Sequence, residues 1–348
     1  MTQIKRDILF GLCLVAIASV LPFLFPGRYV VTQATLFFIW AVVVIQWNLV
    51  LGVGGIFSLA QMALFASGAY ATAMMGFYWK VPMLLAIPLG GVVTVAVGML
   101  IGLACLRLRG PYVALLTLAI AQVIYVLIVN DTACFTSTGG CMPLFGGVRG
   151  IGQFGDIGFR TLFPRSWHIA HYFVALALLV VAVATSIVII RGPLGLAFRS
   201  LRDNPGYAVS RGISRFKYQL WIFAVSAFLT GIAGGFYAVH FRVVGPTVFS
   251  FQLLLFLIAM VVVGGLGTIW GPLLGAAVLM LADEGVKELS EYRNIGLGLL
   301  LVMFIILQPG GLVKLFSPNG IGGRVRKACS RVRGRSQVQN ATSERPTD

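Results

Sequence analysis

The sequence predicts an all-α fold, a polytopic membrane helix bundle of about ten spans, half-helices included. Hydrophobic residues make up 59% of the 348 residues and charged residues only 10%, whereas soluble domains carry about 25% charged residues. The mean hydropathy is +0.95, and one crossing takes about 20 apolar residues. The composition therefore excludes a soluble enzyme, a disordered chain and a nucleic-acid-binding module.

Apolar stretches that end at charged, glycine or proline residues define the predicted spans. In chain order they cover residues 8–25, 29–51, 56–78, 83–106, 112–130, 169–190, 218–239, 249–263, 268–282 and 295–307. The first follows Lys5 and Arg6, as the apolar core of a signal peptide does, but it continues to Phe25 and is long enough to span. An uncleaved first helix is therefore favoured over a cleaved signal.

Three segments are too polar to cross a membrane. The glycine-rich segment 131–167 is predicted to be an outer loop, and segment 191–217 a helical inner loop. Residues 314–348 are basic and then polar, a pattern typical of disorder. The chain is therefore expected to consist of one membrane domain, residues 1–313, and a tail, residues 314–348.

The distribution of charge predicts the orientation. With the N-terminus inside, the inner segments hold 18 of the 26 Lys and Arg residues and four of the ten Asp and Glu residues, a net charge of +14 against +2 outside. Inner loops of membrane proteins collect Lys and Arg, so this excess is a topology signal rather than a nucleic-acid-binding surface. Both termini and the loop 191–217 are expected in the cytoplasm, and the loop 131–167 in the periplasm.

Uncharged polar and small residues inside the spans are the candidates for a solute path. The candidates are Ser58, Gln61, Thr117, Gln122, Gly264 and Gly265, and the spans also contain Gln46 and Asn48. Two interpretations stay open. Such residues either pack helices closely and bond between them, or belong to interrupted helices whose freed backbone groups line a path.

Several kinds of chemistry are missing from the sequence. No Gly-x-x-x-x-Gly-Lys-Ser/Thr motif occurs, so the chain is not expected to hydrolyse ATP. No acidic residue lies in the middle of a predicted span, which disfavours a carrier coupled to protons or sodium. The cysteines form no Cys-x-x-Cys pair, and His168 and His171 have no acidic partner nearby, so neither a metal nor a cofactor is expected. Cys134 and Cys141 are disulfide candidates, with two free thiols as the alternative.

The inner loop is predicted to contain two short helices. Pro193 and Gly195 break the preceding span, and residues 196–201 have apolar side chains at helical spacing, with Arg199 and Arg202 facing outward.

The second helix follows a turn signal at residues 204–206. It is expected to start at Ala208 and to end at Gly212, in a left-handed cap that a side chain would strain. Two short helices suit the docking of a partner, and a charged connector is the alternative interpretation.

At this loop a family becomes recognisable. The segment GPLGLAFRSLRDNPGYAVSRGISRFKYQLWIFAVSAFLTGIAGGFYA resembles the cytoplasmic coupling loop and next helix of permeases in branched-chain amino-acid ABC importers. The segments GGIFSLAQMALFASGAY, LRLRGPYVALLTLAIAQ, VVVGGLGTIWGPLLGAAV and QPGGLV resemble the same family. The resemblance covers most of residues 49–313 and is closer to the second permease type than to the first. Permeases for urea, amides or aromatic acids belong to the same superfamily.

The resemblance implies a transport subunit rather than an enzyme, in the bacterial inner membrane. It implies a second permease subunit as heterodimer partner, two ATP-binding cassette subunits, and a periplasmic solute-binding protein. The coupling-loop residues are then Arg199, Arg202, Asp203, Ala208 and Gly212. Ala208 and Gly212 match the family's Glu-Ala-Ala-three residues-Gly pattern, whereas Gly206 and Tyr207 replace the Glu and first Ala. The expected solute is a branched-chain amino acid. The alternatives are a urea, amide or aromatic-acid permease, or a stand-alone carrier or channel.

Overall fold

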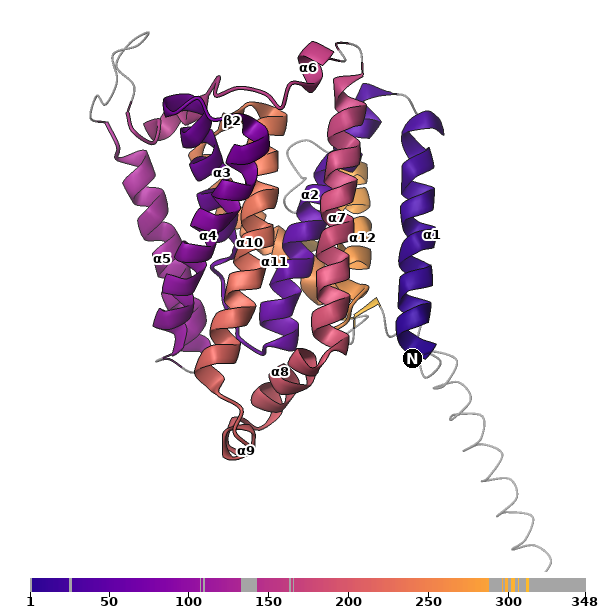
Figure 1. Ribbon diagram of the computed structural model, residues 1–348, viewed down its shortest axis with the longest axis vertical. Coiled ribbons are helices and arrows are strands. Elements are labelled where there is room, and N and C mark those ends of the chain that lie inside the picture. The colour runs from indigo at the N-terminus through magenta and orange to yellow at the C-terminus, as the bar shows by residue number, and fades with distance from the viewer. Residues whose placement is uncertain are drawn as a thin grey trace, which may run out of the picture.

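A computed structural model describes residues 2–24, 27–106, 108, 110–132, 143–162, 164 and 166–287, and a few isolated residues between 296 and 312. Over these residues the chain is almost entirely helical, and most of the long helices run along the length of one bundle (Figure 1). The predicted all-α membrane bundle is confirmed.

The long helices account for nine predicted spans. They are α1 Thr2–Leu24, α2 Arg28–Asn48, α3 Gln61–Tyr78, α4 Met83–Leu106, α5 Pro111–Val129, α7 Trp167–Arg191, α10 Arg215–Phe241, α11 Phe251–Gly264 and α12 Gly271–Val286. Short elements lie between them: η1 Leu49–Val53, η2 Gly147–Arg149, β1 Ile151–Gly152, α6 Phe159–Leu162, α8 Pro193–Asp203, α9 Pro205–Ser210, β2 Val243–Val244 and η3 Pro246–Phe249. The tenth predicted span, residues 295–307, lies almost wholly outside the described residues.

Six of the described helices are long and apolar enough to cross a membrane by themselves: α1, α2 with η1, α4, α5, α7 and α10. Helices α11 and α12 have 14 and 16 residues, too few for a full crossing. The prediction of the third span was wrong at its start. Residues 54–60 are not helical, and α3 begins only at Gln61.

Helix α10 occupies the middle of the bundle and packs against α2, α3 and α4. Small residues permit the close approach to α3, because a Cβ atom at Gly68 would lie only 2.3 Å from the Gly231 carbonyl oxygen. Such contacts replace the hydrophobic effect as the force between helices in lipid. The packing interpretation of the glycines therefore holds along this interface.

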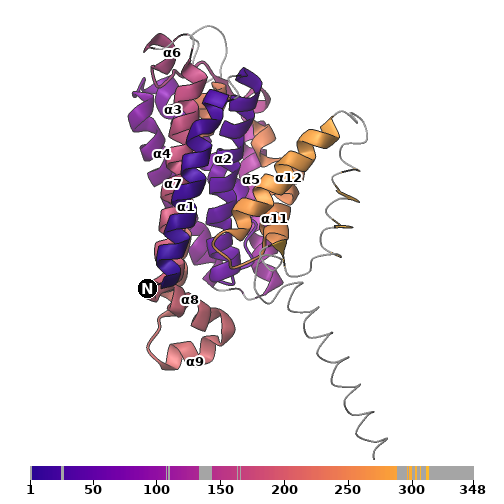
Figure 2. The same cartoon turned by 90° about the vertical axis from the view of Figure 1, so that its right-hand side faces the viewer.

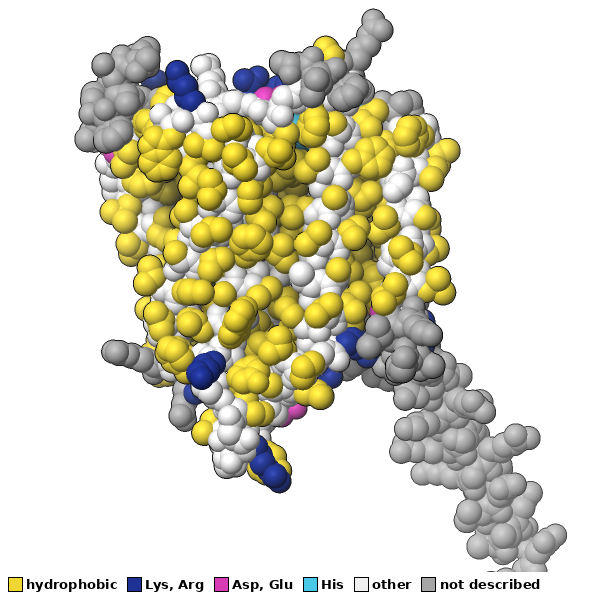
Figure 3. Space-filling view, viewed as in Figure 1, with side chains coloured by type: hydrophobic (Ala, Val, Ile, Leu, Met, Phe, Trp, Pro, Cys, Tyr) yellow, Lys and Arg dark blue, Asp and Glu magenta, His cyan; other side chains and the backbone are white. Residues whose placement is uncertain are grey.

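The two ends of the bundle differ. The inner end is defined here as the end that holds the start of α1 together with α8 and α9, and the outer end holds α6 and β2 (Figure 1). Strands β1 and β2 pair antiparallel, Ile151 with Val244, a contact that the sequence analysis did not predict. Figure 3 shows apolar side chains over the flank of the bundle and Lys and Arg side chains at both ends.

Candidate functional site

The inner loop, residues 191–217, leaves the bundle as helix α8. Pro193 occupies the first turn of this helix, where its missing N–H breaks no helical bond. Gly195, predicted to help end the preceding span, lies inside α8 instead. Phe198 is buried, and its ring meets the ring of Tyr218 on α10 at 5.8 Å. One side of α8 therefore packs against the bundle.

Helix α9 starts earlier than predicted. Asn204 is its N-cap, and the side-chain oxygen of Asn204 accepts a hydrogen bond of 3.1 Å from the Tyr207 N–H. Pro205 follows in the first turn, so the expected turn at residues 204–206 is a capped helix start. Asn is a favoured N-cap residue, and proline is favoured at the first position of a helix.

The end of α9 agrees with the prediction for Gly212. The helix ends at Ser210, and Gly212 has φ +84°, the left-handed region that favours glycine. Ala208 is buried, and its carbonyl oxygen accepts a hydrogen bond of 3.1 Å from the Ile213 N–H. The chain therefore reverses direction at Gly212 and continues into α10.

The tip of the loop exposes apolar surface. Tyr207 and Val209 are more than half exposed, and the Arg211 guanidinium lies over the Tyr207 ring at 5.3 Å from its centre. Helix α9 lies farther from the bundle than any other labelled helix (Figures 1 and 2). An exposed aromatic–arginine pair on a projecting helix has the character of a docking surface.

Arg199 and Arg202, predicted to face outward together, point to different places. The Arg199 Nη2 atom is 3.5 Å from the Ile190 carbonyl oxygen at the end of α7. The Arg202 Nη1 atom donates a hydrogen bond of 2.7 Å to the carbonyl oxygen of Gly52, 150 residues away. Its Nε atom also pairs with Asp203, at 3.0 Å from Oδ1. Arg202 is therefore 40% exposed at its side chain and at the same time bonds the end of a membrane helix.

Gly52 lies in an interruption between α2 and α3, called here the α2 break, residues 49–60. Its first part is the π-helix η1, and the rest is irregular. The Ser58 carbonyl oxygen accepts a hydrogen bond of 2.8 Å from the indole of Trp47, which holds the irregular part against the end of α2. The break leaves backbone groups that need partners other than the helix itself.

A second interruption, the α11 break, comprises residues 265–270 between α11 and α12. The buried side chain of Asn48 joins it to α2. Its Oδ1 atom accepts from the Gly267 N–H, and its Nδ2 atom donates to the Thr268 carbonyl oxygen, both at 2.8 Å. A Cβ atom at Gly52 would lie 2.3 Å from the Gly267 nitrogen, so the two breaks are in direct contact.

The predicted path residues fall into three groups. Gly264 and Gly265 are buried at the end of α11, beside the α11 break. Ser58, Gln61 and Thr117 are buried around the end of the α2 break, and Gln122 alone is exposed. The structure therefore brings three of the polar residues together and separates Gln122 from them.

The three buried polar residues make internal hydrogen bonds. The Gln61 amide donates to the Thr230 hydroxyl at 2.6 Å. The Thr117 hydroxyl accepts from the Leu59 N–H at 2.9 Å. The Ser58 hydroxyl accepts from the Ala60 N–H at 3.3 Å. The bonds to Leu59 and Ala60 hold the irregular backbone of the α2 break in place, and the Gln61 bond ties the start of α3 to α10.

A charged contact fixes the start of the inner loop. Arg191 pairs with Asp7 of α1 at 2.6 Å, and the Trp270 indole lies 3.4 Å from the other Asp7 oxygen. Asp7 is buried, and a buried carboxylate requires such partners. The sequence analysis had not singled out Asp7, because it lies among the charges that precede the first span.

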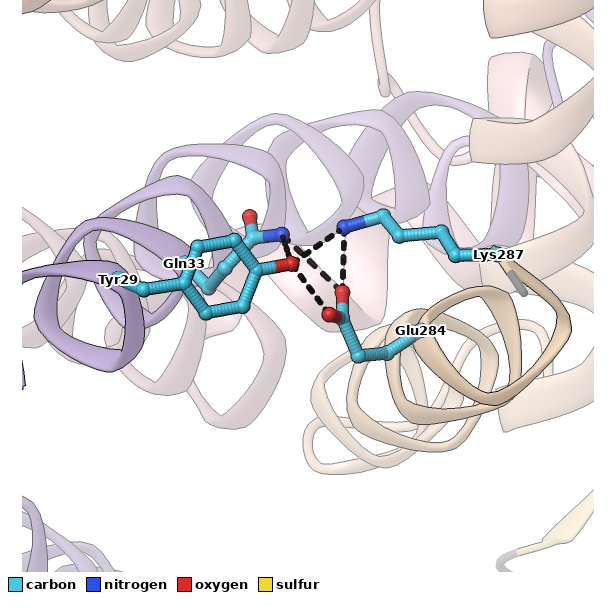
Figure 4. A network of polar contacts seen from close by, with 4 residues as sticks. All are labelled: Tyr29, Gln33, Glu284 and Lys287. Atoms are coloured by element: carbon cyan, nitrogen blue, oxygen red, sulfur yellow. Dashed lines mark hydrogen bonds and ion pairs between the residues drawn. The ribbon is translucent and has the colours of Figure 1, made fainter. Parts of the chain in front are cut away.

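A different polar network lies at the outer end (Figure 4). Tyr29 and Gln33 at the start of α2 bond to Glu284 near the end of α12, with 3.1 Å between the Gln33 amide and Glu284. Lys287 pairs with Glu284 and donates to the Tyr29 hydroxyl at 3.0 Å. Tyr29 and Glu284 are exposed. The sequence analysis did not predict this network.

The histidines and cysteines of the described residues form no metal site. His171 lies with its Nδ1 atom 3.1 Å from that of His240, not paired with His168. The expectation of no acidic neighbour was wrong for His171, whose Nε2 atom lies 3.8 Å from the Asp156 carboxylate. Within the described residues, no group of three His, Cys, Asp or Glu side chains is placed to hold a metal. Cys134 and Cys141 lie outside the described residues, so their disulfide stays a prediction.

These features define a class: a multi-pass membrane protein of the permease type, with two interrupted helices in contact and a structured loop bonded to them. Residues 29–307 match the family described as the permease component of branched-chain amino acid transport systems. The chain belongs to this family, and it is a transport subunit of the inner membrane rather than an enzyme.

Two relatives carry the same description. The chain is 32% identical over 322 residues to the high-affinity branched-chain amino acid transport system permease protein LivM of Salmonella typhimurium. It is 31% identical over 332 residues to LivM of Escherichia coli K12. Each alignment covers 89% of this chain and 76% of the relative. No solved structure matches the chain.

Proposed function

We propose that this chain translocates branched-chain amino acids across the bacterial inner membrane, as one permease subunit of an ABC importer. A second permease subunit completes the membrane part. Two ATP-binding cassette subunits supply the energy, and a periplasmic binding protein delivers the solute. The family membership and the names of the two relatives support this proposal.

The observation that supports energy input in trans is the inner loop. Helices α8 and α9 project from the bundle (Figure 2), and α9 exposes Tyr207 and Val209. ATP hydrolysis in another chain changes this one only through a contact that differs between states. Arg199, Arg202, Asp203, Ala208 and Gly212 belong to this loop, and we assign ATPase docking to its exposed tip.

The orientation follows from charge. Both termini and the inner loop lie in the cytoplasm, and the loop 131–167 lies in the periplasm. The test uses a variant without native cysteines, into which Ser210→Cys or Val148→Cys is introduced, since both positions are exposed. An impermeant thiol reagent on intact cells should label the Val148→Cys variant alone. Labelling of the Ser210→Cys variant from outside contradicts this orientation.

The solute path runs beside the two breaks. Ser58, Gln61 and Thr117 stabilise the α2 break, and Gly264 and Gly265 precede the α11 break. Gln122 is exposed on the bundle surface, and an amide within a span is costly in lipid unless it finds a partner. We therefore place the second permease subunit against the face of α5 that carries Gln122.

Reconstituted uptake tests the whole proposal. Proteoliposomes that contain both permease subunits and both ATPases should take up leucine only with ATP and the loaded binding protein. Uptake driven by an ion gradient alone would instead identify a stand-alone carrier. ATP-dependent uptake of labelled urea, an amide or an aromatic acid, without uptake of leucine, isoleucine or valine, would identify one of the other superfamily solutes.

A further inference from the structure

The bond between Arg202 and the α2 break points to a role for Arg202 other than docking. The π-helix ends at Val53, so no helical N–H follows to bond the Gly52 carbonyl. The last carbonyls of a helix need outside donors and attract cations. The Arg202 guanidinium supplies both at 2.7 Å. A loop helix thereby completes the end of a membrane helix.

The fit around Arg202 is close. Gly55 has φ +66°, and a Cβ atom there would lie 2.3 Å from the Arg202 Cγ atom. A Cβ atom at Gly267 would lie 3.6 Å from the Arg202 Nη1 atom. The stem of Arg202 therefore lies on the α2 break, and its guanidinium lies beside the α11 break.

The contact has room to change. An open surface cavity of about 250 Å³ lies beside it, and its lining includes the exposed residues Gly55, Arg202 and Pro205 and the half-buried Arg215. Movement of the α8–α9 junction into the cavity therefore meets little steric resistance, and it draws the Arg202 side chain along.

Asn48 extends the connection. Displacement of Gly52 acts on Gly267 and Thr268, because Asn48 bonds both and lies one turn before Gly52 in the chain. Two breaks that touch and share a buried amide are expected to rearrange together. The path of force then runs from α8 through Arg202 to the α2 break, and through Asn48 to the α11 break.

We propose that Arg202 is a positioning residue that transmits movement of the inner loop to both helix breaks, and that it does not dock the ATPase. This inference rests on the proposed function as an ATP-driven importer. It separates two tasks within one loop: the exposed tip at Tyr207 and Val209 binds the partner, and Arg202 passes the movement on.

The test compares Arg202→Met with Arg202→Lys and Arg199→Met in the reconstituted transporter. Methionine keeps the apolar stem and loses the donor, whereas lysine keeps the charge and loses the planar fork. Arg199 is the matched comparison, because it lies on the same helix and bonds the end of α7 instead of a helix break. Three quantities are measured: co-purification of the ATPases, ATP hydrolysis, and leucine uptake.

Arg202→Met should co-purify with the ATPases and hydrolyse ATP, while uptake per ATP falls about tenfold, within the usual range of coupling energies. Arg202→Lys should retain assembly and lose part of the uptake. Arg199→Met should lower uptake per ATP less than Arg202→Met does, because Arg199 bonds the end of α7 and neither helix break. Gly55→Ala, which displaces the Arg202 stem, should lower uptake per ATP as well, and the double variant should be no worse than Arg202→Met, since the two changes break one contact.

Two outcomes overturn the inference while the proposed function stands. One is normal uptake per ATP in Arg202→Met. The other is loss of ATPase co-purification in Arg202→Met with full recovery in Arg202→Lys, which would make Arg202 a docking charge. Absence of ATP-dependent uptake in the wild-type assembly would instead refute the proposed function itself. Size-exclusion profiles of each variant in detergent exclude misfolding as the cause, and Gly55→Ala, which keeps the arginine, provides an independent route to the same contact.

Discussion

Helix α2 is tied to the α11–α12 region at both of its ends, by contacts of opposite character. At the inner end the buried amide of Asn48 bonds two backbone groups of the α11 break. At the outer end Tyr29 and Gln33 bond the exposed carboxylate of Glu284 (Figure 4). The inner contact shields backbone polar groups from lipid, whereas the outer one links side chains that water can reach.

This difference decides which contact matters for stability and which for movement. A buried polar group that loses its partner is left unsatisfied, and the cost is larger than the bond itself. An exposed network exchanges its partners for water at little cost. The inner contact therefore holds the breaks in one arrangement, and the outer contact is the one that opens easily.

Substitution of Asn48 tests the difference between the two ends of α2 most directly. Asn48→Ala leaves the Gly267 N–H and the Thr268 carbonyl without partners, and we expect the free energy of unfolding to fall by about 2–3 kcal/mol. Gln33→Ala is the matched control, because it removes an amide from the same helix at the outer end. The midpoint of thermal unfolding in detergent measures both. Equal shifts for the two variants would show that burial does not separate the two ends.

The tip of the inner loop gives the second largest effect. Gly212→Val forces a β-branched residue into φ +84°, which costs about 1–2 kcal/mol of local strain, although nothing lies within 4 Å of the added Cβ atom. We expect a folded, membrane-inserted permease whose ATP hydrolysis no longer drives uptake. Leucine uptake and ATP hydrolysis are measured in the same proteoliposomes.

The matched control for the tip is Gly206→Ala. This change lies within α9, where the added Cβ atom would be 3.7 Å from the Asn204 side-chain oxygen, an ordinary contact. Transport by this control should stay near the wild-type level. Normal ATP-driven uptake by Gly212→Val at normal expression would remove the second helix of the loop from the mechanism.

Sequence patterns predict the helices of this protein well and their junctions poorly. Apolar runs located nine helices, and six of the described helices are long and apolar enough to cross a membrane, because one crossing imposes its length on the sequence. The pairs Gly54–Gly55 and Gly264–Gly265 mark both breaks, but a glycine pair does not show which other residues it touches. The position of α9 was misjudged because Asn204 followed by a proline signals a helix start as readily as a turn.

The site itself was predicted only in part. Gly212 could be identified because a left-handed cap is a local property of the backbone. The direction of Arg202 could not, since an arginine on a loop helix has the same sequence signature whether it faces solvent or a carbonyl 150 residues away. Asn48 was noted only as a polar residue in a span. Its partners lie 219 and 220 residues away, beyond any periodicity.

The next prediction concerns a disulfide bond in the loop 131–167. If the loop 131–167 faces the periplasm, Cys134 and Cys141 are expected to form a disulfide, which adds about 2 kcal/mol of local ordering by the chain-entropy estimate. Mass spectrometry of non-reduced peptides measures the bond. Complete alkylation of both thiols without reductant would leave the outer loop without this constraint. The inner end has no cysteine in its loop to match it.

The smallest change in stability is expected at Glu284, in the exposed network at the outer end of α2. Glu284→Gln removes the charge that pairs with Lys287 but keeps an acceptor for Tyr29. Because the pair is exposed, the free energy of unfolding should change by less than about 1 kcal/mol. The change should shrink further as salt is raised from low to physiological concentration, since exposed charges are screened. Unfolding midpoints at two salt concentrations measure this dependence. If Glu284→Gln were as destabilising as Asn48→Ala, and independent of salt, the outer network would have to be covered in the assembled transporter, where burial removes the water that makes it dispensable.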